Sequence, residues 1–185
     1  MHMKLRTVAV LIALLALSGT PICANILTNG SFETGDFTGW AVAANATGVN
    51  ASGFDGYAPQ DGQYFAALGP VGGEGSMSQT FSDTAGEYVL TFFIASHGDS
   101  NSNFSAYWNG NQLMSVVTPD SGRAYVQYQF AVTGTGNDTV SFLFRDDPAY
   151  IALDNVSVDQ VVPEPTSFFF IGGGLIGLAI RLRRR

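Results

Sequence analysis

The C-terminal end carries the feature that most limits what this chain can fold into: an apolar segment followed directly by arginines. Residues 168–180 contain no charged side chain. Four arginines follow the segment: Arg181, Arg183, Arg184 and Arg185. A helix over residues 167–182 would be about 24 Å long, somewhat short of the roughly 30 Å hydrocarbon core of a bilayer. Because arginines stay on the cytoplasmic side, the pattern predicts a marginal transmembrane helix with the folded part outside. A buried core helix is the alternative.

The N-terminal end predicts export. Lys4 and Arg6 precede an apolar block at residues 8–17, and small residues follow, with Ala24 as the expected cleavage position. This is the layout of a secretory signal peptide, which makes the Sec translocon and signal peptidase expected partners. Lipidation of Cys23 is the alternative, although Ile22 is an unusual residue before a lipidated cysteine. Cleavage after Ala24 would leave no cysteine, so the fold must stand without disulfides.

The residues between these two signals are strongly acidic. Residues 25–160 are enough for one domain with its own core. Residues 25–165 hold all 15 acidic residues and two basic ones, Arg123 and Arg145, for a formal charge of minus 13. A phosphate backbone requires a basic patch. Nucleic acid is therefore not an expected partner, whereas cations and neutral polymers are compatible with this charge.

The central region predicts an all-β fold. Short runs rich in Val, Phe, Tyr and Thr alternate with clusters of Gly, Asn, Asp and Ser, and no segment keeps a helical period. Eight strands are expected, at residues 63–68, 76–81, 88–96, 103–108, 112–117, 125–132, 139–145 and 150–158. About eight or nine strands suit a sandwich. We expect a turn at Asn109-Gly110, a strong hairpin signal, and another at residues 134–138.

Alternation within these strands predicts the core. Tyr128, Phe130 and Val132 lie on one face of their strand. Val140, Phe142 and Phe144 likewise lie on one face of the next strand. We expect these two sets of residues to form the core. Residues 89–94 are apolar on both faces. This predicts a central strand that is covered on both sides.

The tail resembles the PEP-CTERM sorting signal of Gram-negative bacteria. Pro163, Glu164 and Pro165 match its three-residue motif, and residues 181–185 match its basic end. The resemblance implies that an exosortase, a membrane-embedded cysteine transpeptidase, processes the tail, and that the host makes an exopolysaccharide matrix. It implies export, a transient anchor in the inner membrane, and a final place on the outer cell surface or in the extracellular matrix. The two prolines also predict a stiff linker.

The central domain resembles carbohydrate-binding and galactose-binding-like jelly rolls. Residues 29–33 (Asn-Gly-Ser-Phe-Glu), 61–64 (Asp-Gly-Gln-Tyr) and 153–158 (Leu-Asp-Asn-Val-Ser-Val) are similar to their opening, middle and closing signposts. The resemblance implies an antiparallel jelly-roll β-sandwich. It also implies a structural calcium bound partly by Glu33 and Asp154, since calcium prefers six to eight oxygen ligands. Alternatively, these two carboxylates cap turns or lie hydrated at the sheet edge.

Several aromatic residues are candidates for stacking against sugar rings. Trp40 follows a glycine-rich turn and is expected to fill the core near Phe32. Trp108 precedes a hairpin, and Tyr57 and Tyr150 lie in loops, so these three are the better candidates for exposed stacking. Ordinary packing is the alternative for each of them.

The sequence predicts a binding or structural protein. His97 is the one histidine between the two signals, and no serine lies in a nucleophile elbow. Picking two catalytic carboxylates from 15 would be arbitrary. We therefore expect a non-enzymatic exported protein with three segments: a signal peptide at 1–24, a β-sandwich at 25–160 and a sorting signal at 161–185. It should engage exopolysaccharide or biofilm through the sandwich. A structural or adhesive protein without a glycan site is the alternative, and no cofactor is expected apart from the calcium.

Overall fold

A computed structural model describes residues 25–45, 47–98 and 101–161. The expected signal helix, transmembrane helix, Pro-Glu-Pro motif and arginine tail lie outside these residues. Within the described ranges, no helix has the length and apolar character needed to span a membrane.

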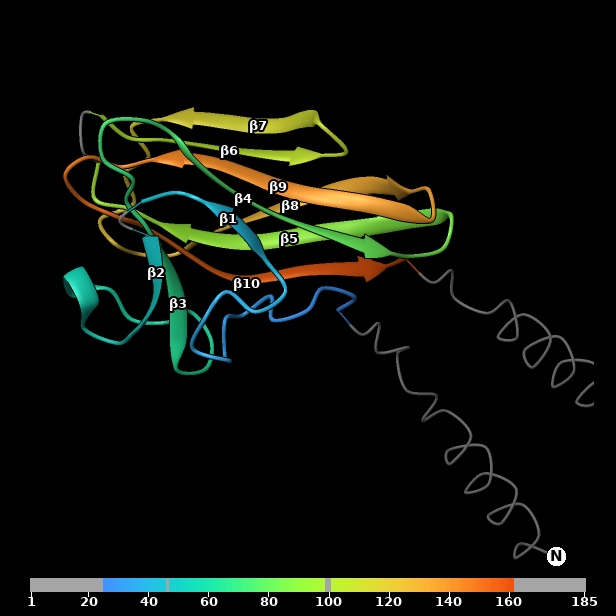
Figure 1. Ribbon diagram of the computed structural model, residues 1–185, viewed down its shortest axis with the longest axis horizontal. Coiled ribbons are helices and arrows are strands. Elements are labelled where there is room, and N and C mark those ends of the chain that lie inside the picture. The colour runs from blue at the N-terminus through green and yellow to red at the C-terminus, as the bar shows by residue number, and fades with distance from the viewer. Residues whose placement is uncertain (1–24, 46, 99–100, 162–185) are drawn as a thin grey trace, which may run out of the picture.

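Ten strands form two antiparallel sheets (Figure 1). The first sheet has the order β1-β4-β9-β6-β7 and the second has the order β2-β3-β10-β5-β8. The strands are β1 (Ala41–Ala43), β2 (Thr47–Ala51), β3 (Tyr64–Leu68), β4 (Gly75–Ser82), β5 (Gly86–Ala95), β6 (Asn103–Trp108), β7 (Asn111–Val117), β8 (Val126–Gly134), β9 (Asn137–Arg145) and β10 (Ile151–Gln160). A short 3-10 turn, η1, spans Phe54–Gly56. The all-β sandwich and its eight expected strands are confirmed, whereas β1 and β2 were not predicted.

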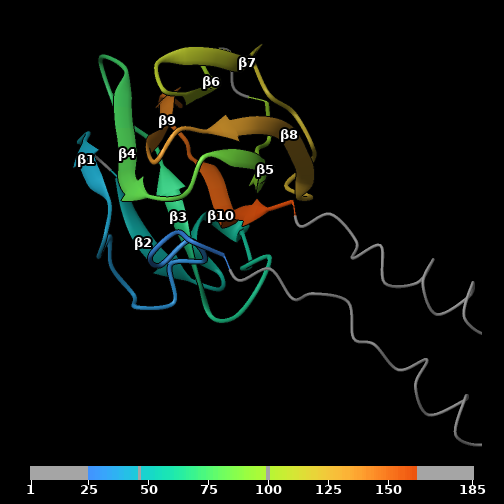
Figure 2. The ribbon, with the colours of Figure 1, turned by 90° about the vertical axis from the view of Figure 1, so that its right-hand side faces the viewer.

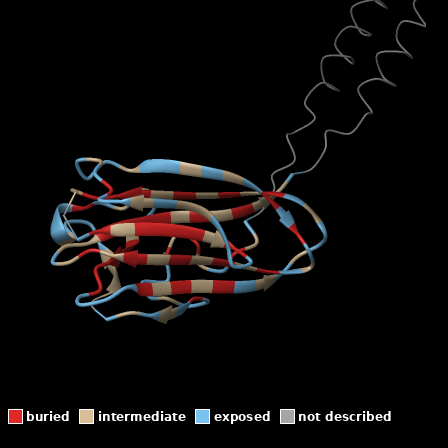
Figure 3. Ribbon diagram, turned by 90° about the horizontal axis from the view of Figure 1, so that it is seen from above, coloured by how far each residue is buried: buried red, intermediate tan, exposed pale blue. Residues whose placement is uncertain are grey.

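The core lies between the two sheets. Buried and more exposed residues alternate along the strands (Figure 3), because successive side chains of a strand point to opposite faces. Phe142 of β9 is fully buried and its ring centroid lies 5.1 Å from that of Phe92 on the facing sheet. Tyr128 and Phe130 of β8 stack on the same Phe92 ring. The core-facing sides predicted for the strands now labelled β8 and β9 are confirmed.

Strand β5 is central, as expected, because it pairs with β10 on one side and β8 on the other. Its core-facing residues from Tyr88 to Ile94 are buried, whereas Val89, Thr91 and Phe93 on the other face are half-buried. The expectation of complete cover on both faces is therefore wrong. A further segment of the chain forms an outer layer over this face, but it covers only one end of the sheet.

That outer layer is the segment of residues 52–63. Tyr57 from this segment is buried against side chains on the outer face of the second sheet, where it forms a small second core with Phe65, Ala67, Ala95 and Ala152. Asp154 alternates with the core residue Leu153 along β10 and so points toward this covered face.

The hairpin between β6 and β7 is built by Asn109 and Gly110. Both residues have positive φ, 50° and 77°, as a two-residue type I′ turn requires. The predicted hairpin is confirmed. Residues 135 and 136 make the equally short connection between β8 and β9, which confirms the second expected turn.

Both ends of the described chain lie at the same end of the sandwich (Figure 2). The amide of Ile26 donates to the carbonyl of Val158 at 3.1 Å, and Gln160 pairs with Tyr88 near the start of β5. The opposite end of the sandwich carries the end of β5, the end of β7 and the start of β8.

Candidate functional site

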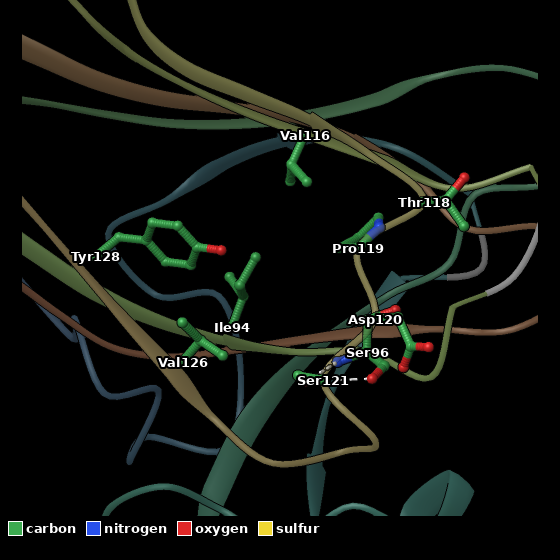
Figure 4. Close-up of a pocket in the computed structure, with 9 residues that line it drawn as sticks. All are labelled: Ile94, Ser96, Val116, Thr118, Pro119, Asp120, Ser121, Val126 and Tyr128. Atoms are coloured by element: carbon green, nitrogen blue, oxygen red, sulfur yellow. Dashed lines mark hydrogen bonds between the residues drawn. The ribbon is translucent and has the colours of Figure 1, made fainter.

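A pocket of about 140 Å³ opens between the two sheets at the end away from the termini (Figure 4). Strands β5 and β8 contribute to it from the second sheet, and β7 with the loop after it contributes from the first. It is lined by Ile94, Ser96, Val116, Thr118, Pro119, Asp120, Ser121, Val126 and Tyr128. Strands β7 and β8 are edge strands of their sheets. The pocket is comparable in size to a cavity of about 150 Å³ that accommodates a benzene ring.

One side of the pocket is apolar and includes the phenol ring of Tyr128. Ile94, Val116 and Val126 supply aliphatic surface around Tyr128. The Tyr128 ring stacks on Phe92, with centroids 5.6 Å apart and planes inclined by 17°, so the core holds its orientation. Its hydroxyl points into the space beside Ile94 (Figure 4).

The other side of the pocket is polar. The Ser121 hydroxyl accepts the amide N–H of Ser96 at 3.1 Å and donates to the Ser96 carbonyl at 3.2 Å. The Ser121 amide donates to the same carbonyl. These bonds fasten the loop after β7 to the end of β5. The loop geometry that closes the pocket is therefore fixed by two serines.

Asp120 lines the polar side and is held by its neighbours. It forms a β-bridge with His97, and its Oδ1 accepts the amide N–H of Gly122 at 3.1 Å. Gly98, at a φ of 84°, allows close contact: a Cβ there would lie 2.8 Å from the Asp120 Cγ. Among the residues that the structure describes, Asp120 is the one charged side chain that lines the pocket.

Trp108 does not form an exposed stacking platform. Its side chain is 6% exposed, packs against Phe81 and donates from Nε1 to the carbonyl of Thr133 at 3.0 Å. The expectation of an exposed Trp108 is therefore corrected, because the residue lies on the core-facing side of β6. Trp40 fills the core, as expected, with its ring centroid 5.9 Å from that of Phe32.

The two tyrosine candidates belong to the outer layer of the second sheet. Tyr57 is 2% exposed and its hydroxyl donates to the carbonyl of Tyr150 at 2.8 Å. Tyr150 is half-buried and lies edge-on to Phe54, with ring centroids 4.9 Å apart. The structure brings these two residues together, but it buries Tyr57, which corrects the expectation that Tyr57 is exposed. Neither tyrosine lines the pocket.

Glu33 and Asp154 both bind the loop of residues 60–64. The Glu33 Oε1 accepts the amide N–H groups of Gln63 and Tyr64, each at 2.9 Å. The Asp154 Oδ2 accepts the amides of Gln60 at 2.7 Å and Asp61 at 3.2 Å. The resemblance therefore identified two carboxylates that accept hydrogen bonds from the same loop.

Backbone amide groups bind both carboxylates. Burial raises the pKa of Asp154 to about 6, and the negative charge of Glu33 adds to the increase, whereas hydrogen bonds from three amides lower it. Calcium binds through oxygen lone pairs, but all four carboxylate oxygens already accept N–H groups. The described residues include no cluster of three His, Cys, Asp or Glu able to hold a metal. These hydrogen bonds favour the turn-capping alternative, and the structural calcium stays a prediction.

The pocket residues were not among the sequence candidates. The sequence predicted Tyr128 as a core residue. This is correct for the ring face that stacks on Phe92, but the hydroxyl points into the pocket. The Thr-Pro-Asp-Ser-Gly run at residues 118–122 is a strong turn signal. This run could have marked a functional loop, but nothing in it indicated which strand end it meets.

Comparisons with known proteins identify the tail and the fold. Residues 161–185 match the profile of the PEP-CTERM protein-sorting motif. No curated protein sequence matches the chain. Among solved structures, the module TmCBM61, in complex with beta-1,4-galactotriose, is 21% identical with a TM-score of 0.59, covering 75% of this chain and 99% of the module.

Two other solved structures share the fold. A cyclase from Fischerella sp. TAU is 16% identical with a TM-score of 0.57, covering 77% of this chain and 99% of the cyclase. The enzymatically active domain of Bacteriophage CBA120 tailspike protein 4 is 15% identical with a TM-score of 0.53, covering 74% of this chain and 21% of that one. The same fold thus hosts different functions. The chain carries the PEP-CTERM protein-sorting motif at residues 161–185 and, before it, a domain with the jelly-roll fold that the module TmCBM61 also has.

Proposed function

We propose that this is a non-enzymatic protein of the cell surface or extracellular matrix whose pocket binds a sugar residue of an exopolysaccharide. The observation that carries the proposal is the pocket around Tyr128, which combines one ring-sized space with an apolar side and a polar side. The likeness to a module solved with a galactotriose supports it. The Gram-negative host and its biofilm belong to the same proposal, supported by the sorting motif.

The chemistry of the pocket matches that of a pyranose. A sugar ring presents C–H groups on its faces and hydroxyls at its rim. Ile94 and Val116 provide apolar contact for the faces, while the Tyr128 hydroxyl provides a polar group for the rim. Ligand sites commonly combine mostly apolar walls with a few placed polar groups. The stacking on Phe92 holds the phenol in place before any ligand arrives.

The position of the pocket also suits a tethered binding module. Gln160, the last residue of β10, pairs with Tyr88, and Ile94 of the pocket lies six residues further along β5. At about 3.4 Å per residue this places the pocket about 20 Å along the sandwich from the start of the sorting segment. A polymer outside the cell can therefore reach the pocket while the other end of the domain is held.

Binding by the full chain to the exopolysaccharide of its host tests the proposal. The protein should be kept in a detergent without a sugar headgroup and applied to a polysaccharide pulldown and a glycan array. Tyr128→Phe removes only the pocket hydroxyl, so we expect retention to fall by about tenfold, the effect of one lost hydrogen bond. Tyr107→Phe is the matched control, because that hydroxyl bonds Gln112 on the outer face of β6.

The outcomes separate the candidate functions. Equal retention of both tyrosine variants would refute the pocket as the sugar site. Binding to no glycan, together with weaker biofilm when the gene is deleted, would favour the structural or adhesive alternative. Turnover of a polymeric sugar by the purified chain would show a hydrolase instead.

A further inference from the structure

We infer that the pocket prefers neutral sugars and amino sugars over sugars that carry a carboxylate, and that Asp120 determines this selectivity. The inference rests on the proposed sugar-binding function and specifies its ligand class. Asp120 contributes a negative charge to the lining, and none of the nine lining residues is basic. A uronate ring would place its own carboxylate in the same small space.

The charged and titratable groups near Asp120 do not neutralise it. The Arg123 guanidinium is directed to another loop, where its Nε donates to the carbonyl of Asp55 at 3.1 Å and the group lies 5.5 Å from the Tyr57 ring centroid. His97 meets Asp120 through a backbone bridge, and its imidazole packs edge-on to Tyr57. Tyr128 and the serines of the lining are neutral at pH 7. Among the described residues that line the pocket, Asp120 therefore carries the one formal charge.

The Asp120 side chain is exposed, and a hydrogen bond orients its carboxylate. The Gly122 amide holds one carboxylate oxygen, and the other side of the group lies against Gly98, where any Cβ would collide with it. Two like charges about 4 Å apart in a solvated site repel enough to weaken binding by about fivefold, and by more where water is excluded.

Matched monosaccharides test this selectivity. Because the pocket has the volume of one ring, the probes are the methyl glycosides of a hexose, its 2-amino sugar and its uronate, in the glucose, galactose and mannose series. The full chain, in a detergent without a sugar headgroup, is titrated at pH 7 by ligand-observed NMR. For the series that binds, we expect the uronate to bind at least about fivefold more weakly than the neutral hexose.

Asp120→Asn should reduce that difference to less than about twofold and should weaken binding of the amino sugar. Glu87→Gln is the matched control: it removes one negative charge at the start of β5, outside the pocket, and should leave the ranking unchanged. A uronate that binds wild type as tightly as its hexose would overturn the inference while leaving the proposed function intact. Binding of none of the nine probes would overturn both.

Discussion

Replacing Trp108 distinguishes a core residue from a sugar-stacking residue. The side chain is 6% exposed, packs on Phe81 and donates a hydrogen bond to the Thr133 carbonyl. Substituting alanine for a large buried aromatic residue costs about 3–5 kcal/mol of unfolding free energy. For a domain of this size, that corresponds to a decrease of about 12–20 °C in melting temperature. Such a loss is a large part of the 5–15 kcal/mol that typically stabilises a domain.

Urea and thermal unfolding of the full chain, followed by circular dichroism, measure this loss. Trp108→Phe keeps most of the apolar contact but removes the indole donor, so we expect a cost of about 1 kcal/mol. Tyr107→Ala is the neighbouring control, since that half-buried residue points to the outer face of the same strand. If Trp108→Ala left stability unchanged and abolished glycan retention, the core assignment would be refuted and the original stacking hypothesis restored.

Two further predictions concern the tail and calcium. Mature protein isolated from the host should lack Arg181 to Arg185 by intact mass spectrometry, because the PEP-CTERM motif implies processing by an exosortase. An intact tail would indicate a plain membrane anchor. Chelation with EDTA should leave the melting temperature unchanged, because amide groups already satisfy Glu33 and Asp154. A decrease that added calcium reverses would instead support the structural calcium, since an ion that binds only the folded state stabilises it.

The strands could be predicted from the sequence because their burial pattern is local. Val140, Phe142 and Phe144 are buried on one sheet face, whereas the residues between them, Ser141 and Leu143, are only half-buried on the other. The short strands β1 and β2 lacked such a pattern. Gly48 and Asn50 interrupt β2 with residues of low strand propensity, and pairing with β3 overrides that local preference.

The pocket could not be predicted because it depends on contacts between distant segments. Ser121 meets Ser96 across 25 positions of sequence, and neither residue carries a local signal for the other. The burial of Tyr57 and Trp108 has the same origin, since both look like loop or hairpin residues until the strands are placed. For Glu33 and Asp154, the family resemblance identified the loop they share, but only the structure showed that amide N–H groups occupy their oxygens.

The pocket and the start of the sorting segment lie at opposite ends of the domain. The described chain begins and ends at one end of the sandwich, as the bond from Ile26 to Val158 and the pairing of Gln160 with Tyr88 show. The pocket opens at the other end, about 20 Å along β5. Charges that far apart are largely screened at physiological ionic strength, where the Debye length is about 8 Å. A charge gained or lost beside Gln160 would therefore change little in the electrostatic potential at Asp120. On this basis the same pocket can serve a protein that stays tethered and one that is released into the matrix.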